Sequence, residues 1–170
     1  LHEQDERIAV GVAAGGVPLG AILIEDTVRP EAAACVQALK ELDINRVLLL
    51  SGDNAGTARK VADVVGIGEV HAELLPQDKV SLIEDWVRKE GHVLMAGDGV
   101  NDAPALAAAS VGVAMGAIGT DVALETAPVA LMNDDLGKIP WLIRHSRRTL
   151  RIIGWNIGLA LGTKLLFVLL

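Results

Sequence analysis

Short apolar runs alternate with amphipathic stretches along the middle of this chain. The runs lie at Gly20–Ile24, Arg46–Leu50, Val70–Ala72, Val93–Ala96, Val111–Met115 and Val129–Leu131, and each has the length of a buried strand. The stretches between them predict helices over Glu31–Leu42, Ala55–Val65 and Gln77–Glu90. Gly66 and Gly91 follow the last two helices, where glycine commonly ends a helix. This alternation predicts an α/β fold, with a parallel sheet and helices on both of its faces.

The N-terminal residues follow a different pattern. The runs Ile8–Ala13 and Val17–Ile24 flank Gly15-Gly16, which predicts a hairpin of strands returning from another domain. We therefore expect three parts: return strands over residues 1–19, the α/β domain over residues 20–135, and a separate C-terminal segment over residues 136–170.

The C-terminal segment combines a basic stretch with an apolar one. The stretch Leu136–Arg151 carries five basic side chains: Lys138, Arg144, Arg147, Arg148 and Arg151. The run Trp155–Leu170 follows, with Asn156 and Lys164 as its strongly polar side chains. This run is shorter than the ~20 residues that span a bilayer, so a buried core helix is one interpretation. We favour a basic helix running into a truncated transmembrane helix, because a basic cluster beside an apolar helix marks its cytosolic side.

Composition and charge exclude some classes of function. The net charge of −7 over 170 residues argues against a nucleic-acid binder, which needs a basic surface to neutralise phosphates. The single cysteine, Cys35, excludes an internal disulfide framework, and no CxxC pair or closely spaced histidine pair predicts a zinc site. A membrane protein with residues 1–150 in the cytosol fits these features.

Three loops that carry polar groups follow predicted strands. They are Ser51-Gly52-Asp53-Asn54, the stretch Leu75–Lys79 and Gly97–Asp102, which lies within the sequence MAGDGVNDAPA. Ligands of parallel α/β sheets bind beyond the carboxyl ends of the strands, so these loops are expected to converge. A hydroxyl, glycine amides, a lysine and two carboxylates suit a phosphate group with Mg²⁺, which prefers carboxylate oxygens.

The sequences SGDN, PQDK and GDGVNDAPAL, in this order and spacing, resemble the phosphorylation domain of P-type ATPases, which belong to the haloacid dehalogenase superfamily. Asp26 in IEDTVRPEA, followed by Arg29, is similar to the start of that domain. The resemblance implies a Rossmann-like sheet, use of ATP and Mg²⁺, and a nucleotide-binding domain to which residues 1–19 would return. The family has threonine where Ser51 stands. Its DKTGT loop, which carries the phosphorylated aspartate, does not occur in this sequence.

The resemblance also implies a role for each site residue. Asp98 would be the Mg²⁺ ligand, with Asp102 as a second carboxylate near the metal that also orients Lys79. Lys79 would neutralise the phosphoryl group. Ser51, Gly52 and Asn101 would bind its oxygens, and Asp53 would arrange the site around the nucleotide. Phosphoryl transfer needs such groups because it depends mainly on positioning and charge stabilisation.

The sequence TLRIIGWNIGLALGTKLLF resembles the following helix of the heavy-metal subclass, and Lys164 is similar to a lysine of the zinc, cadmium and lead exporters. Lys164 lies 12 residues beyond Ile152, about 18 Å along a helix. At that depth an ionisable side chain is costly and tends to be functional, although a lysine can also extend to the headgroups.

Three functions remain open at this point. The leading one is part of an ATP-driven exporter of Zn²⁺, Cd²⁺ or Pb²⁺, which would act with the rest of the same protein, with the bilayer and with the transported metal. The second is a soluble phosphatase of the same superfamily, and the third is an inactive regulatory fragment. The absence of the nucleophilic aspartate predicts that this chain alone is inactive.

Overall fold

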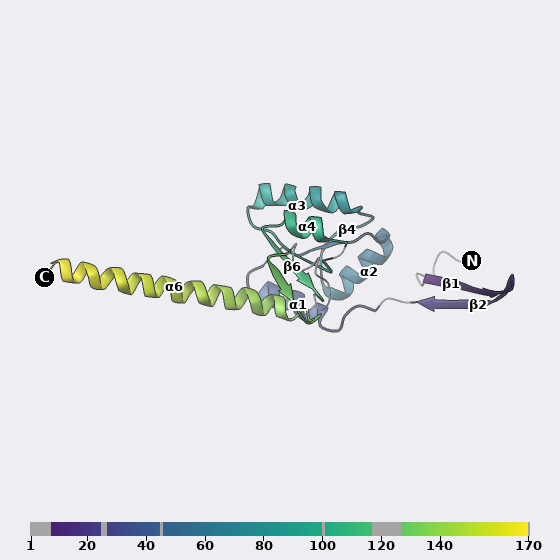
Figure 1. The fold of residues 1–170 in the computed structure, drawn as a ribbon, viewed down its shortest axis with the longest axis horizontal. Helices are drawn as coiled ribbons and strands as arrows, with labels where there is room; N and C mark the ends of the chain where they lie inside the picture. The colour runs from purple at the N-terminus through teal and green to yellow at the C-terminus, as the bar shows by residue number, and fades with distance from the viewer. Residues whose placement is uncertain (1–7, 25–26, 45, 100, 117–126, 170) are drawn as a thin grey trace.

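The computed structural model describes residues 8–24, 27–44, 46–99, 101–116 and 127–169. In chain order the elements are β1 (Ile8–Ala14), β2 (Val17–Ile24), α1 (Ala32–Glu41), β3 (Leu48–Leu50), α2 (Ala55–Val65), β4 (Glu69–His71), α3 (Pro76–Glu90), β5 (Leu94–Gly97), α4 (Ala103–Ala108), β6 (Val111–Met115), β7 (Val129–Leu131) and α6 (Lys138–Leu169). Figure 1 shows an α/β body, with the β1–β2 hairpin extending from one side and α6 from the other.

The strands of the body are parallel, as the alternating pattern predicts. Strand β3 pairs with β4, and β5, β6 and β7 form a second sheet in that order. In the described part of the chain, no ladder joins β3 to β5, so the strands form two hydrogen-bonded groups. The parallel α/β prediction is therefore confirmed, with the sheet divided between β3 and β5.

Helices cover both faces of these strands, and each side has its own apolar cluster. One cluster unites α3, α4, β5 and β6 through Ile83, Trp86, Met95, Ala105, Leu106, Ala114 and the nearby Ala127. The other packs α1 against α2 through Val36, Ala62, Val65 and Ile67. Leu48 and Leu50 of β3 pack on the first cluster and Leu49 on the second, which is the alternation expected of a strand between two layers.

The N-terminal hairpin is confirmed, and it corrects one predicted strand. Gly15 and Gly16 both have positive φ, 59° and 82°, as a tight two-residue hairpin turn requires. Strand β2 pairs antiparallel with β1. The expected buried strand at Gly20–Ile24 is therefore the second half of an antiparallel strand, and its Ile22 is exposed. A boundary after residue 19 would cut through β2, while the division into three parts stays a prediction.

The C-terminal segment is one continuous helix. Helix α6 has 32 residues, about 48 Å at the usual helical rise, and it is long and apolar enough to cross a membrane. None of its most apolar window is buried in the molecule, which argues against the core-helix interpretation. Near its start, Arg147 Nη1 donates a hydrogen bond to the Leu42 carbonyl at 2.6 Å, just beyond the end of α1.

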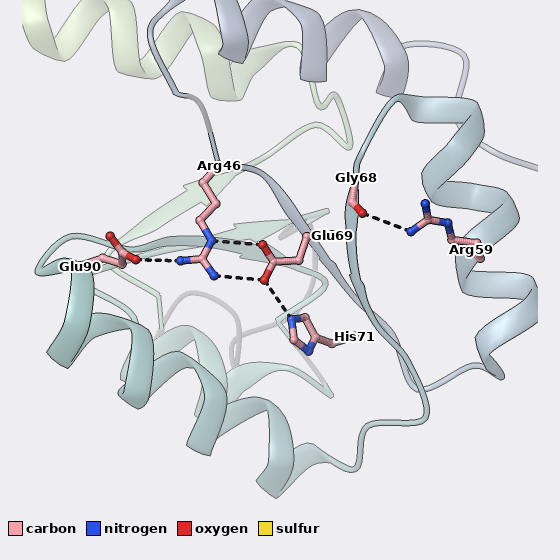
Figure 2. A network of polar contacts seen from close by, with 6 residues as sticks. All are labelled: Arg46, Arg59, Gly68, Glu69, His71 and Glu90. Atoms are coloured by element: carbon pink, nitrogen blue, oxygen red, sulfur yellow. Dashed lines mark hydrogen bonds and ion pairs between the residues drawn. The ribbon is translucent and has the colours of Figure 1, made fainter.

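A polar network ties the start of β3 to its neighbours at the end of the sheet opposite the loops (Figure 2). Arg46 donates two hydrogen bonds to Glu69, at 3.1 and 3.2 Å, and one to Glu90 at 2.7 Å. These bonds hold the pKa of Glu69 below its ordinary value. His71 lies 3.3 Å from the same carboxylate and meets the Trp86 ring edge-on. The network therefore joins β3, β4 and α3.

Candidate active site

The first site loop follows β3 and is held by its own side chains. Ser51 Oγ donates a hydrogen bond to Asp53 at 2.7 Å and accepts one from the Asp53 amide at 3.1 Å. Asn54 then caps α2 by accepting from the Thr57 amide at 2.9 Å. Because the loop runs directly into a helix N-terminus, its amides and the helix dipole favour an anion at this place.

The second loop, which precedes α3, is bonded to the first. The Leu74 amide donates to the Ser51 carbonyl at 3.1 Å, and the Glu73 amide donates to the Asp53 carbonyl at 2.8 Å. A side chain on Gly52 would come within 3.4 Å of the Leu74 carbonyl oxygen. The backbones of the two loops therefore lie against each other at the carboxyl ends of β3 and β4.

The second loop is joined to the third by an ion pair. Lys79, in the first turn of α3, places its Nζ 2.7 Å from Oδ1 of Asp102. The two side chains are only 15% and 17% exposed, so the pair is partly shielded from water. Such shielding strengthens the attraction and makes loss of either partner costly.

The third loop, between β5 and α4, carries the exposed carboxylate of Asp98. Asn101 donates to this carboxylate from its amide at 3.2 Å and from its side chain at 3.4 Å. Gly99 adopts a φ of 77°, a left-handed conformation that favours glycine in the turn. Asp98 and Asn101 thus face each other across a tight turn at the carboxyl end of β5.

The carboxylates of the third loop fit a Mg²⁺ ion that takes its remaining ligands from water and substrate phosphate. Within the described ranges, no group of three or more acidic, histidine or cysteine side chains gathers to form a complete metal cage. Mg²⁺ does not need one, since it keeps several waters and binds one or two carboxylates together with substrate phosphate. The exposed Asp98 suits such a ligand. Asp102 is engaged by Lys79, which suits orientation of the lysine better than direct coordination.

Other predicted residues lie outside this group. Asp26 falls outside the described residues. Arg29 bonds to Asp134, both to its carbonyl at 2.9 Å and to its carboxylate at 2.5 Å. Lys164 lies in α6, 26 residues after Lys138 and so about 39 Å along the helix. The structure thus leaves Lys164 in a separate region and joins the other predicted site residues in linked loops: Ser51, Gly52, Asp53, Lys79, Asp98, Asn101 and Asp102.

Sequence reasoning missed Gly97 as a site residue. It is the last residue of β5, and a Cβ built on it would lie 2.8 Å from Oδ2 of Asp102. The signal was present in the sequence, because this glycine directly precedes the Asp98 loop. A glycine next to such a loop has several explanations, and only the folded structure shows which atoms approach it.

The comparisons with known proteins agree with the parallel α/β fold. The family model of haloacid dehalogenase-like hydrolases matches residues 1–110. The chain is 49% identical to a cadmium-transporting ATPase of Staphylococcus aureus over 152 residues, which is 89% of this chain and 21% of that protein. It is 47% identical to the cadmium, zinc and cobalt-transporting ATPase of Bacillus subtilis over 173 residues, 100% of this chain and 25% of that protein.

Solved structures show the same relationship. A zinc-transporting PIB-type ATPase in the E2.Pi state superimposes with a TM-score of 0.79 and 41% identity, over 95% of this chain and 26% of that one. The chain therefore spans about a fifth to a quarter of the length of the relatives it matches. With its parallel α/β body and matching family model, the chain belongs to the haloacid dehalogenase-like hydrolase family.

Proposed function

We propose that this chain is part of an ATP-driven heavy-metal exporter that works through an aspartyl-phosphate intermediate, and that it supplies the phosphate and Mg²⁺ loops. The observation that carries the proposal is the shielded Lys79–Asp102 pair, 2.7 Å long, beside the Asp98 loop at the carboxyl end of parallel strands. The similarity to cadmium- and zinc-transporting ATPases supports the same reaction.

In this proposal each loop acts on the transferred phosphoryl group. Ser51, Gly52 and Asn101 donate hydrogen bonds to its oxygens, and the Lys79 ammonium offsets the charge that develops on them. Asp102 fixes where that ammonium lies. Asp98 holds Mg²⁺, which when bound polarises the phosphoryl oxygens. In the structure the Ser51 hydroxyl donates its one proton to the Asp53 carboxylate and accepts from the Asp53 amide, so it would turn from that carboxylate to a phosphoryl oxygen when one is bound.

The nucleophile has to come from another part of the intact protein. Strands β3 and β5 are edge strands of separate groups, yet Leu48 and Leu50 of β3 pack on the cluster that contains Met95 of β5. A strand placed between them and parallel to both would bring its carboxyl end to the three loops. We propose that this strand carries the aspartate. Its carboxylate would attack the γ-phosphorus of ATP, ADP would leave with the electron pair, and water would later hydrolyse the acyl phosphate.

The transported ion and the membrane belong to the C-terminal region. Helix α6 would cross the bilayer with the basic residues near its start on the cytosolic side, and residues 1–150 would then be cytosolic. Lys164 would face the ion pathway as a charge that competes with a divalent metal for an acidic ligand. The zinc and cadmium class of cargo rests on the similarity to transporters named for these metals.

Phosphorylation of the intact protein tests the proposal. With γ-labelled ATP and transported metal, the intact protein should form an acid-stable phosphoenzyme. Asp98→Asn should lower this phosphorylation at least about 100-fold, the usual scale for losing a group that stabilises transition-state charge. Asp63→Asn changes an exposed carboxylate on α2 that pairs with Arg59, and it should leave phosphorylation unchanged.

The 170-residue chain provides the complementary measurement. Without the nucleophile it should neither hydrolyse ATP nor form a phosphoenzyme. Metal-dependent ATP turnover by the purified chain would refute the proposal that the nucleophile lies in another part of the intact protein. Full phosphorylation of Asp98→Asn would refute the proposed role of the Asp98 loop.

A further inference from the structure

Gly97 lacks a side chain for a reason of space. The glycines with positive φ among the described residues are Gly15, Gly16, Gly66, Gly91, Gly99 and Gly116. Gly97 is not one of them, and it sits in the ladder opposite Ala114 as an ordinary parallel-strand residue. Its backbone conformation would therefore accept alanine. The methyl group of that alanine, however, would meet the neighbouring Asp102 carboxylate.

The Asp102 side chain occupies the position of the missing methyl group. A Cβ on Gly97 would lie 2.8 Å from Oδ2, 3.1 Å from Cβ and 3.3 Å from Cγ of Asp102. Real carbon–oxygen contacts of this kind do not occur at 2.8 Å, so either the carboxylate or the strand has to move. The close approach covers most of the side chain, including its stem next to the backbone.

Asp102 cannot move without losing Lys79. Its Oδ1 accepts from Lys79 Nζ at 2.7 Å while Oδ2 faces Gly97, so the carboxylate is held between the two. Its carbonyl accepts from the Leu106 amide at 2.8 Å, which fixes its backbone at the start of α4. Rotating the carboxylate away from a methyl group at position 97 would turn Oδ1 away from the ammonium.

We propose that Gly97 is a positioning residue. By leaving room for the Asp102 carboxylate, it allows that carboxylate to hold the Lys79 ammonium between the second and third loops. The geometric part of this proposal stands on contacts within the chain. Its importance for phosphoryl transfer rests on the proposed function. The two parts can be tested separately.

The geometric test measures how exposed the Lys79 amine is in the full 170-residue chain in detergent micelles. Reductive methylation followed by mass spectrometry gives a labelling rate for each lysine, and Lys89, exposed on the same helix, serves as the internal reference. We expect Gly97→Ala to accelerate labelling of Lys79 several-fold relative to Lys89, and Asp102→Ala should do the same. Gly68→Ala adds the same methyl group where nothing lies within 4 Å, and it should change nothing.

The double variant decides whether Gly97 acts through Asp102. Gly97→Ala combined with Asp102→Ala removes the 2.8 and 3.3 Å contacts, so its Lys79 labelling should equal that of Asp102→Ala alone. If Gly97→Ala does not fold, the double variant should fold because the obstructing carboxylate is gone. Wild-type labelling of Gly97→Ala, or failure of the double variant to fold while Asp102→Ala folds, would overturn the proposal.

Kinetics of the intact protein test the link to phosphoryl transfer. Gly97→Ala should slow phosphoenzyme formation at least tenfold, and the double variant should be no slower than Asp102→Ala alone. If the labelling results hold while both single variants phosphorylate at the wild-type rate, the positioning role is supported and the proposed function fails. If the two losses multiply in the double variant, Gly97 acts independently of Asp102 and the positioning role is wrong.

Discussion

At the scale of single residues, the Lys79–Asp102 ion pair joins the second site loop to the third. Both side chains are less than a fifth exposed, and the two residues are 23 positions apart in sequence. A pair in this setting is sensitive to loss of one partner, because the other is left as a partly dehydrated charge.

Lys79→Met should therefore destabilise the chain. The methionine keeps most of the apolar stem but leaves the Asp102 carboxylate without its ammonium. We expect a loss of about 1–3 kcal/mol in the free energy of unfolding, as for a buried polar group deprived of its partner. Urea unfolding of the chain in micelles measures the loss. Lys89→Met, at an exposed position of the same helix, should stay within about 0.5 kcal/mol of wild type, and equal losses in both variants would contradict the prediction.

At the scale of elements, local signals predict some boundaries and tertiary contacts decide others. Strands β6 and β7 lie where the apolar runs predict them, at Val111–Met115 and Val129–Leu131. Strand β3 begins only at Leu48, two residues after the predicted start at Arg46, whose guanidinium bonds to Glu69 and Glu90. The apolar run Gly20–Ile24 also predicts a buried strand of the sheet, although the hairpin signal at Gly15-Gly16 already assigns it to the pairing with β1 that the structure shows.

The site shows the same division between local and tertiary information. Local motifs predict the polar groups of the loops, because hydroxyl, lysine and carboxylate chemistry can be recognised from residue types. The contact between Gly97 and Asp102 could not be predicted, because it depends on how α4 starts against the end of β5. Helix α4 was itself missed, since six residues in an alanine-rich stretch give no clear amphipathic period.

The Arg46 network makes stability depend on pH at the joint between β3, β4 and α3. Hydrogen bonds from Arg46 lower the pKa of Glu69 in the folded chain. The stabilisation is therefore complete above the ordinary carboxyl pKa, declines as pH falls below it, and is lost once pH falls through the lowered value. Glu69→Gln should lower the melting temperature at pH 7, by a small amount because the groups are half-exposed.

The same difference in melting temperature should disappear at acid pH. Thermal melts of wild type and Glu69→Gln between pH 7 and pH 2 measure it. Glu84→Gln alters an exposed glutamate on α3 and serves as the control, with no change expected at any pH. A difference that persists undiminished at the acid end would show that Glu69 acts by packing rather than by its charge.

At the scale of the whole molecule, α6 runs from the α/β body into a long stretch of exposed apolar side chains. Its first turns pack on the α/β body, where Ile139 and Pro140 are buried and Arg147 bonds to the Leu42 carbonyl. Its later turns expose apolar side chains throughout, from Ile152 to Leu169. Because one helix spans both regions without a break, a displacement of the body would be transmitted along it. Under the proposed function, α6 is the element of this chain that would connect phosphoryl transfer with ion movement.

Lys164 tests whether the two ends of this path are coupled. If α6 crosses the bilayer as proposed, Lys164 lies deep in the membrane, where an unpaired charge would cost at least about 2.5–3.5 kcal/mol. We therefore expect an acidic partner on a neighbouring helix of the intact protein. A divalent metal that binds this acid would displace the ammonium, which would then return and favour release. Lys164→Ala should therefore reduce the metal stimulation of ATP hydrolysis several-fold while leaving phosphorylation of the body possible.

The measurement is ATPase activity of the intact protein with Zn²⁺, Cd²⁺, Cu⁺ and no metal. Lys138→Ala, at the exposed start of the same helix, is the control. If the wild type responds to Cu⁺ alone, the zinc and cadmium class of cargo is wrong. If Lys164→Ala matches the control, the lysine has no part in transport and serves only to reach the lipid headgroups.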